Sequence, residues 1–149
     1  MRARTSATLV LALLCGWDSA HAQEAIAGVV KSVLGTVIVQ RQTQSLKAIE
    51  GMHVFEQDTV RTLAGSRAGL ILQDGTRLSL DPDTTLTLTR FEYDPGRQKL
   101  GLILDLLRGS AAYISGKISE LAPKSIEIKT PVAMLGLRGT EVIVSLGLP

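Results

Sequence analysis

Apolar and polar residues alternate in three short runs between Ala68 and Thr89, and this pattern constrains the fold more than any other feature of the 149-residue chain. Side chains of a β-strand point alternately to opposite faces, so the alternation predicts strands that are buried on one face. Polar residues on the opposite face are Arg67, Gln73, Arg77, Ser79, Thr85, Thr87 and Thr89. We expect the buried positions to be Ala68, Leu70, Leu72, Leu78, Leu80, Leu86 and Leu88.

The run Leu100–Leu107 is the one place where the choice between helix and strand is open. Leucine and isoleucine at these spacings could form a buried helical turn. Every second residue from Leu100 to Leu106 is leucine, however, and Gly101 would weaken a helix. The Arg-Gly pair at 108–109 ends the run like a turn. We therefore predict a strand here.

The loop Gln73-Asp74-Gly75 determines how two of these strands pair. A two-residue loop would place Leu70 opposite Ser79 and mix apolar and polar residues on one face. A three-residue loop instead places Leu70 opposite Leu78 and makes one face nearly all apolar. Such a loop needs a residue in the left-handed backbone region, which glycine adopts without strain. We predict the three-residue loop, with Gly75 in that conformation.

Further turn signals recur at intervals of about ten residues, which is typical of a β-sandwich or barrel. No stretch rich in Gly and Ser, no block of like charges and no low-complexity tract divides the chain. We predict one all-β domain over residues 25–146, a single antiparallel β-sandwich with short strands and glycine turns. The turn signals fall at Gly51, 64–66, 81–83, 94–96, Gly109 and Gly116.

Residues 1–22 have the organisation of a secretory signal peptide. Met1–Arg4 is basic, Ala7–Trp17 is apolar but too short to span a bilayer, and Ala20-His21-Ala22 is an A-x-A cleavage pattern. We expect cleavage after Ala22 and a mature protein that is periplasmic or secreted. An uncleaved anchor is the alternative. Lipidation of Cys15 is disfavoured, because leucine rather than a small residue precedes it.

Export changes what the composition implies. Cleavage would remove the one cysteine, so a domain of about 125 residues would be held together by its hydrophobic core alone. The mature chain would carry nearly equal numbers of basic and acidic residues, which gives no indication of binding to nucleic acid or to an anionic membrane surface. We expect the few aromatic residues to pack in the core rather than to stack on sugars or bases.

Residues able to carry catalysis are scarce. His53 is the only histidine of the predicted mature chain, and one titratable residue is not a catalytic set. Zinc and copper sites need several His or Cys ligands. The acidic pairs Asp81/Asp83 and Glu92/Asp94 could bind calcium or act as acid and base, but each adjoins a proline in a turn, and aspartate also stabilises turns. We predict no catalytic, cofactor-binding or metal site.

Two segments carry short alternating runs between glycine turns. Thr59–Thr84 reads TVRTLAGSRAGLILQDGTRLSLDPDT, and Thr130–Val142 reads TPVAMLGLRGTEV. Together they resemble the two signature stretches of the FecR domain family, and the resemblance extends over about 25–144. The order and spacing of the pieces are more specific than any one piece. We expect a structural role for the motif residues, which are Gly65, Asp74, Gly75, Thr76, Thr130, Pro131, Arg138, Gly139 and Thr140.

The triplet Arg138-Gly139-Thr140 is the most recognisable end of this motif. A functional interpretation has Arg138 bind an acidic partner or ligand. A structural one has Gly139 adopt a backbone angle closed to other residues while Arg138 pairs with a local carboxylate or carbonyl. The structural interpretation is favoured, because glycine beside a strand marks a bulge or a close approach.

The resemblance implies a jelly-roll-like β-sandwich and a periplasmic location. In the better-known relatives this domain receives a signal from an outer-membrane iron transporter, and a transmembrane helix joins it to a cytoplasmic anti-sigma segment. The sequence shows no such segment and no internal membrane span in the mature chain. We therefore expect this chain to share the family's domain and its periplasmic location, but not its role in iron signalling.

These observations predict an exported, non-enzymatic FecR-like domain that serves as a protein-binding or sensory and regulatory accessory module. We expect its partner to be another envelope protein and expect no nucleic acid and no cofactor. A structural or carbohydrate-contacting module of the cell envelope is the alternative. An enzyme that uses His53 is the weakest candidate.

The segment Thr140–Leu146 alternates valine with polar residues and predicts the last strand. If this strand ends a sheet, its unpaired N–H and C=O groups could bind a strand of the partner. We place the possible partner edge at Val142 and Val144. The alternative is that this strand lies inside the sandwich.

Overall fold

The computed structural model describes residues 25–137 and 139–146, and most of this part of the chain is β-strand. Three short helical segments, η1 (Pro95–Arg97), α1 (Lys117–Leu121) and η2 (Pro123–Ser125), lie in connections. The strands are β1 (Ile26–Leu34), β2 (Val37–Arg41), β3 (Gln44–Lys47), β4 (His53–Phe55), β5 (Thr59–Thr62), β6 (Arg67–Leu72), β7 (Arg77–Leu80), β8 (Thr85–Asp94), β9 (Lys99–Arg108), β10 (Ser110–Ile114), β11 (Ile126–Lys129), β12 (Met134–Gly136) and β13 (Glu141–Ser145).

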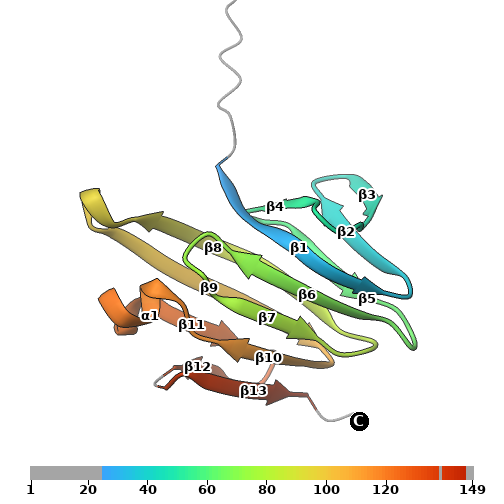
Figure 1. Cartoon of the computed structure of the whole chain (residues 1–149). Coiled ribbons are helices and arrows are strands. Elements are labelled where there is room, and N and C mark those ends of the chain that lie inside the picture. Colours follow the sequence, from blue (N-terminus) through green and yellow to red (C-terminus); the bar gives the residue numbers. More distant parts are fainter. Residues whose placement is uncertain (1–24, 138, 147–149) are drawn as a thin grey trace, which may run out of the picture.

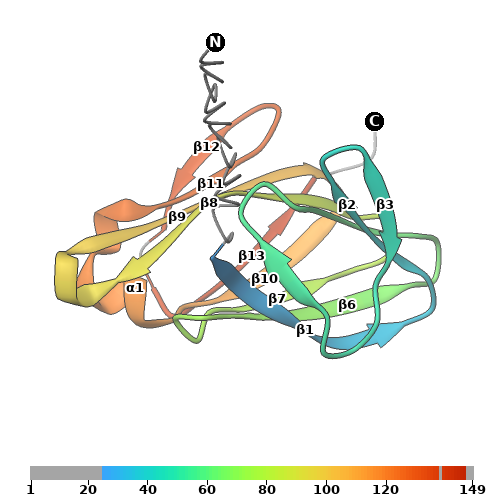
Figure 2. The same ribbon diagram turned by 90° about the horizontal axis from the view of Figure 1, so that it is seen from above.

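The strands form two sheets that pack face to face, as Figure 1 and the view from above in Figure 2 show. The six-stranded sheet has the order β13-β10-β7-β6-β1-β4, and the seven-stranded sheet has the order β12-β11-β9-β8-β5-β2-β3. The prediction of an all-β sandwich is therefore confirmed. No helix in the described part of the chain is long and apolar enough to cross a membrane.

The core lies between the sheets and is built from the alternating residues. Every position from Ala68 to Leu88 that the alternation predicts to be buried is at most 5% exposed. Strand β9 covers the ambiguous run from Leu100, and Leu102, Leu104 and Leu106 are buried in it. The strand prediction for this run is thus confirmed. Burial of this many large aliphatic side chains is the main stabilising contribution in a domain without disulfides.

The β6–β7 hairpin has the predicted register. Leu70 lies opposite Leu78 and Ala68 opposite Leu80. The backbone N–H of Leu72 donates to the carbonyl of Thr76 at 2.8 Å, which closes the three-residue loop. Gly75 has a φ of +86°, in the left-handed region that the loop requires.

Gly75→Val should lower the free energy of unfolding by about 1–3 kcal/mol, because a β-branched residue is strained at this φ. A Cβ atom here would meet no other atom within 4 Å, so the substitution isolates backbone strain from steric overlap. Gly75→Asn is the matched control, since asparagine tolerates the left-handed region. Thermal unfolding followed by circular dichroism measures both, and a valine variant as stable as the wild type would contradict the loop assignment.

One pair of strands departs from the predicted antiparallel arrangement. Strands β9 and β11 pair in parallel, so the seven-stranded sheet is mixed. Parallel neighbours need a crossover connection rather than a tight turn. The chain provides one by passing through β10 in the other sheet and then through α1 and η2 before it returns as β11.

The first strand contains a bulge. A register shift lies between Val30 and Ser32 where β1 pairs with β6. Val30 is therefore in the core at 1% exposure, whereas Val29 is only partly buried. A bulge of this kind changes which face the following residues occupy.

Both sheets end on the same side of the sandwich, in β12 and β13 (Figure 1). The chain passes directly from one edge strand to the other through residues 137–140. At the other ends of the two sheets lie β4 and β3. Within the described residues the sandwich therefore has four edge strands.

Candidate functional site

The Asp74-Gly75-Thr76 turn is a hydrogen-bonding centre that holds the start of α1. The Asp74 carboxyl group accepts bonds from the Thr76 N–H at 3.1 Å, the Thr76 hydroxyl at 2.8 Å and the Ile118 N–H at 3.3 Å. The Asp74 carbonyl accepts from the Lys117 N–H at 2.8 Å. A Cβ atom at Gly116 would overlap with the backbone of this turn. These bonds connect the turn between β6 and β7 to the first residues of α1.

Tyr113 lies in the core near this turn. Its side chain is 1% exposed, and its hydroxyl has no hydrogen-bond partner among the described residues. Burial, together with the nearby Asp74 carboxyl group, raises the pKa of Tyr113 to about 12. The Thr76 hydroxyl opposes this shift, although it does not lie in hydrogen-bonding geometry with the phenol oxygen.

Tyr113→Phe should leave stability at pH 7 unchanged or slightly higher, because it removes a buried polar atom without a partner. In the wild type the pKa in the folded state exceeds the ordinary value of 10.0. Titration of Tyr113 therefore leaves the free energy of unfolding unchanged below about pH 10 and lowers it as the pH rises from about 10 to about 12. Between these values the free energy of unfolding of the wild type should fall relative to the variant by about 1 kcal/mol per pH unit. Urea unfolding from pH 8 upward tests this, and identical pH profiles for the two proteins would refute it.

The Arg-Gly turn between β9 and β10 packs closely on Thr84. The Thr84 hydroxyl donates to the Ser110 carbonyl at 3.1 Å and accepts from the Ser110 N–H at 3.1 Å. Gly109 has a φ of +86° and lies against the backbone of Thr84 and Asp83. This contact fixes the point at which the chain passes from the seven-stranded to the six-stranded sheet.

Gly65, Thr130 and Pro131 also lie in turns. Gly65 has a φ of +68° in the turn between β5 and β6. Thr130 begins the turn from β11 to β12, where its hydroxyl accepts from the Ala133 N–H at 3.0 Å and Pro131 follows it. These positions shape connections between strands.

The end of the motif leads into β13. Arg138 lies outside the described residues, so the prediction that its guanidinium pairs locally stays a prediction. Gly139 has a φ of +123°, a conformation that side chains rarely adopt. The Thr140 carbonyl accepts from the Ser115 N–H at 2.8 Å and so begins the pairing of β13 with β10.

The residues considered for catalysis are dispersed. His53 is exposed at the start of β4, and its backbone carbonyl accepts a hydrogen bond from the Arg41 guanidinium at 3.1 Å. Within the described residues, no group of three or more His, Cys, Asp or Glu side chains could hold a metal ion. Three of the four acidic residues in the two pairs bond to nearby groups: Asp81 to Arg67, Glu92 to Arg90, and Asp94 to the backbone N–H of Arg97.

Strand β4 has its edge occupied by the chain itself. The Arg41 guanidinium binds the buried Asp58 carboxyl group at 2.7 Å and also donates to the His53 carbonyl. The same carboxyl group accepts from the Phe55 N–H at 3.0 Å, and Arg41 covers the Phe55 ring at 4.4 Å. Arg41 and Asp58 therefore occupy two of the backbone groups that β4 turns away from β1, the His53 carbonyl and the Phe55 N–H.

Strand β13 has an open edge. Among the described residues it pairs only with β10. The bonds from the Ser115 N–H to the Thr140 carbonyl and from the Leu146 N–H to the Gly109 carbonyl determine which residues of β13 face β10. Alternation along an antiparallel pair then directs the N–H and C=O groups of Val142 and Val144 toward β10. The groups that face outward belong to Glu141, Ile143 and Ser145, and no described residue bonds to them. The edge groups thus belong to the neighbours of the two predicted valines.

The side chains of β13 follow the same alternation. Val144 is buried and Val142 partly buried, so both face the core. Ile143 is 69% exposed on the outer face of the sheet, between the exposed Glu141 and Ser145. An exposed edge strand with a β-branched apolar residue at its centre is prone to pair with another strand.

The other two edge strands are less suited to strand addition. Strand β12 has three residues, which limits the number of backbone bonds that it can offer. Strand β3 has four residues and ends in the exposed Lys47, a residue type that discourages edge pairing. Among the described edges, β13 is therefore the longest one that is not already closed by the chain.

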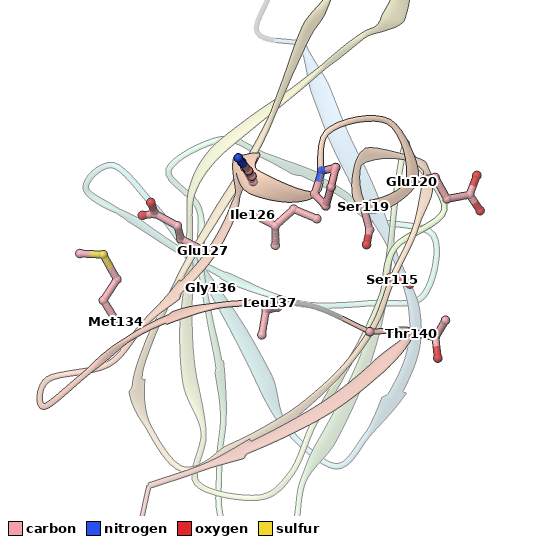
Figure 3. Close-up of a pocket in the computed structure, with 12 residues that line it drawn as sticks. Ser115, Ser119, Glu120, Ile126, Glu127, Met134, Gly136, Leu137 and Thr140 are labelled. Atoms are coloured by element: carbon pink, nitrogen blue, oxygen red, sulfur yellow. The ribbon is translucent and has the colours of Figure 1, made fainter.

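A groove of about 760 Å³ lies beside the start of β13 (Figure 3). Figure 3 shows Met134 and Glu127 at one end and Ser115 and Thr140 at the other, with α1 and η2 on one side and β12 on the other. Its lining mixes apolar side chains with two acidic ones and one lysine. The lining residues are Ser115, Ser119, Glu120, Pro123, Lys124, Ile126, Glu127, Met134, Gly136, Leu137, Gly139 and Thr140.

Comparison with known proteins gives one family. Searches of curated proteins and of solved structures returned no match. The family model described as FecR protein matches residues 58–147, which is more than half of the chain and includes both the Asp-Gly-Thr turn and β13. The chain therefore belongs to the FecR protein family.

Proposed function

We propose that this chain is an exported, non-enzymatic accessory domain that binds another protein of the cell envelope by adding a strand of that protein to β13. FecR is a regulatory and signalling family, is not known as enzymatic and is typically associated with the envelope. The observation that carries the proposal is the open edge of β13, where the outward groups of Glu141, Ile143 and Ser145 lack partners among the described residues.

Strand addition would use groups already in place. The incoming backbone would bond to the three outward-facing residues, and side chains on alternate positions would contact Ile143 on the outer face or extend the core beside Val142 and Val144. The backbone bonds provide affinity, and the side-chain contacts provide specificity. No catalytic group is needed, in agreement with the dispersed positions of His53 and the acidic pairs.

The groove beside β13 is a separate surface, and the test distinguishes the two. Immobilised protein is incubated with envelope extract, and recovered proteins are identified by mass spectrometry. We expect Ile143→Pro to abolish recovery and Met134→Glu, in the groove, to preserve it. In parallel, the protein is sedimented with peptidoglycan and with surface polysaccharide. Polymer binding without protein recovery would overturn the proposal in favour of a structural or carbohydrate-contacting module.

A further inference from the structure

The edge of β13 is complementary to itself. In an antiparallel pair centred on Ile143, this residue faces Ile143 of a second copy, and Glu141 faces Ser145 of the second copy. The residues that turn their N–H and C=O groups outward are the same three on both copies. Each of them then meets an outward-facing residue, which is the condition for a continuous antiparallel ladder.

Charges and side chains agree with this register. Glu141 lies opposite a serine rather than opposite a second glutamate, so the pair brings no like charges together across the strands. Ile143, which is 69% exposed in the single chain, would pack against its copy on the outer face. On the inner face Val142 would lie opposite Val144 of the second copy, so the apolar face of the sheet would continue across the pair.

We propose that β13 pairs with β13 of a second copy when no other partner is bound, and that this pairing closes the edge until a partner's strand displaces it. The inference rests on the proposed function, in which β13 is the binding edge. The pair is isologous, because the same strand contributes to both sides, and it joins the two six-stranded sheets into one. It would also protect the edge from uncontrolled association.

Cysteine cross-linking tests the register directly. The full chain contains one cysteine, so Cys15→Ser provides a background without thiols. On that background Ile143→Cys should give a covalent dimer under mild oxidation, because hydrogen-bonded partners have Cα atoms about 5.5 Å apart, within disulfide reach. Ile114→Cys is the matched control on the same face of β10. Its copies would be separated by three strand spacings, about 14 Å, which no disulfide spans.

Two further variants test the antiparallel direction. Glu141→Cys and Ser145→Cys should each remain uncross-linked alone, and they should form a covalent dimer when they are mixed. Sedimentation of the wild type should show a concentration-dependent dimer, which Ile143→Pro abolishes. We expect Ile143→Cys to yield at least about tenfold more covalent dimer than Ile114→Cys, since only the former lies within disulfide geometry.

The experiments distinguish failure of self-pairing, failure of the register and failure of the proposed function. A wild type that stays monomeric at all concentrations, or equal cross-linking at 143 and 114, overturns self-pairing. Cross-linking of Glu141→Cys alone overturns the register. If self-pairing fails while Ile143→Pro still abolishes recovery of an envelope protein, the proposed function stands without this inference. If recovery is also unaffected, both fail.

Discussion

Asp74→Ala should lower the free energy of unfolding by about 3–5 kcal/mol, because the substitution leaves several buried donors without an acceptor. The Asp74 side chain accepts bonds from Thr76 and from the Ile118 N–H, and both Asp74 and Thr76 are buried. Water cannot replace these bonds without opening the turn. We expect the melting temperature to fall by roughly 10–20 °C in thermal unfolding.

Asp74→Asn is the matched control. Its side chain keeps the size of the aspartate and one acceptor oxygen, so it can hold the Thr76 N–H. The amide NH2 that replaces the other oxygen can accept neither the bond from the Thr76 hydroxyl nor the bond from the Ile118 N–H. The order of stability should be wild type, then asparagine, then alanine. Amide hydrogen exchange should show loss of protection first at Ile118, whose N–H bonds to the lost oxygen. An alanine variant that melts with the wild type would refute the assignment of Asp74 as the anchor of α1.

Gly109→Ala should destabilise the protein by about 3 kcal/mol or more, through backbone strain and overlap together. Gly109 has a φ of +86°, and a Cβ atom there would overlap with the Thr84 hydroxyl, with the Thr84 Cα at 2.6 Å and with the Asp83 carbonyl oxygen at 2.7 Å. Two of these three atoms belong to backbone, so the clash cannot be relieved by a side-chain rotation.

Gly96→Ala provides the control for a glycine without these constraints. Gly96 is exposed in η1, has no positive φ, and its added Cβ would meet only the Asp94 carboxyl oxygen at 3.7 Å. Its stability should change by no more than about 0.5 kcal/mol. Urea unfolding of both variants measures the contrast. Similar losses at the two positions would show that the turn at 109 is not held by the contact with Thr84.

Local pattern predicted the β6–β7 hairpin and the strand β9, because both depend on residues that are neighbours in sequence. The register of β6 and β7 follows from requiring apolar residues to share a face, and Gly75 supplies the loop conformation. The strand at Leu100–Leu107 follows from the same alternation. In both cases the residues that decide the structure are within a few positions of one another.

The order of strands within the sheets could not be predicted in this way. The parallel pairing of β9 with β11 depends on a crossover through the other sheet, which no alternation reveals. Helix α1 is only five residues long, with one buried residue, Ile118, so it has too few turns to show a helical period. It forms because Asp74, far away in sequence, holds its start.

The partner edge shows the same contrast between what local pattern predicts and what depends on strand pairing. The sequence of β13 alternates and predicts a strand, with Val142 and Val144 on one face. Which residues turn their backbone groups outward depends on the phase of pairing with β10, and this phase assigns the edge to Glu141, Ile143 and Ser145. The ion pair between Arg41 and Asp58 beside β4 could not be predicted either, because no sequence pattern connects these two residues.

Strand addition at β13 is tested most directly by a pair of proline variants. Ile143→Pro removes an N–H that faces outward, and Val142→Pro removes one that the ladder directs toward Tyr113 of β10. Melting temperature and recovery of an envelope protein from extract are measured for both. Val142→Pro should melt well below the wild type, whereas Ile143→Pro should melt within a few degrees of it.

The decisive measurement is the amount of envelope protein that the Ile143→Pro variant recovers from the extract. We predict that this variant, folded and as stable as the wild type, recovers no envelope protein above background. Proline at this position would block backbone pairing on the outer side of β13 without disturbing the bonds to β10. Recovery equal to that of the wild type would contradict strand addition at β13.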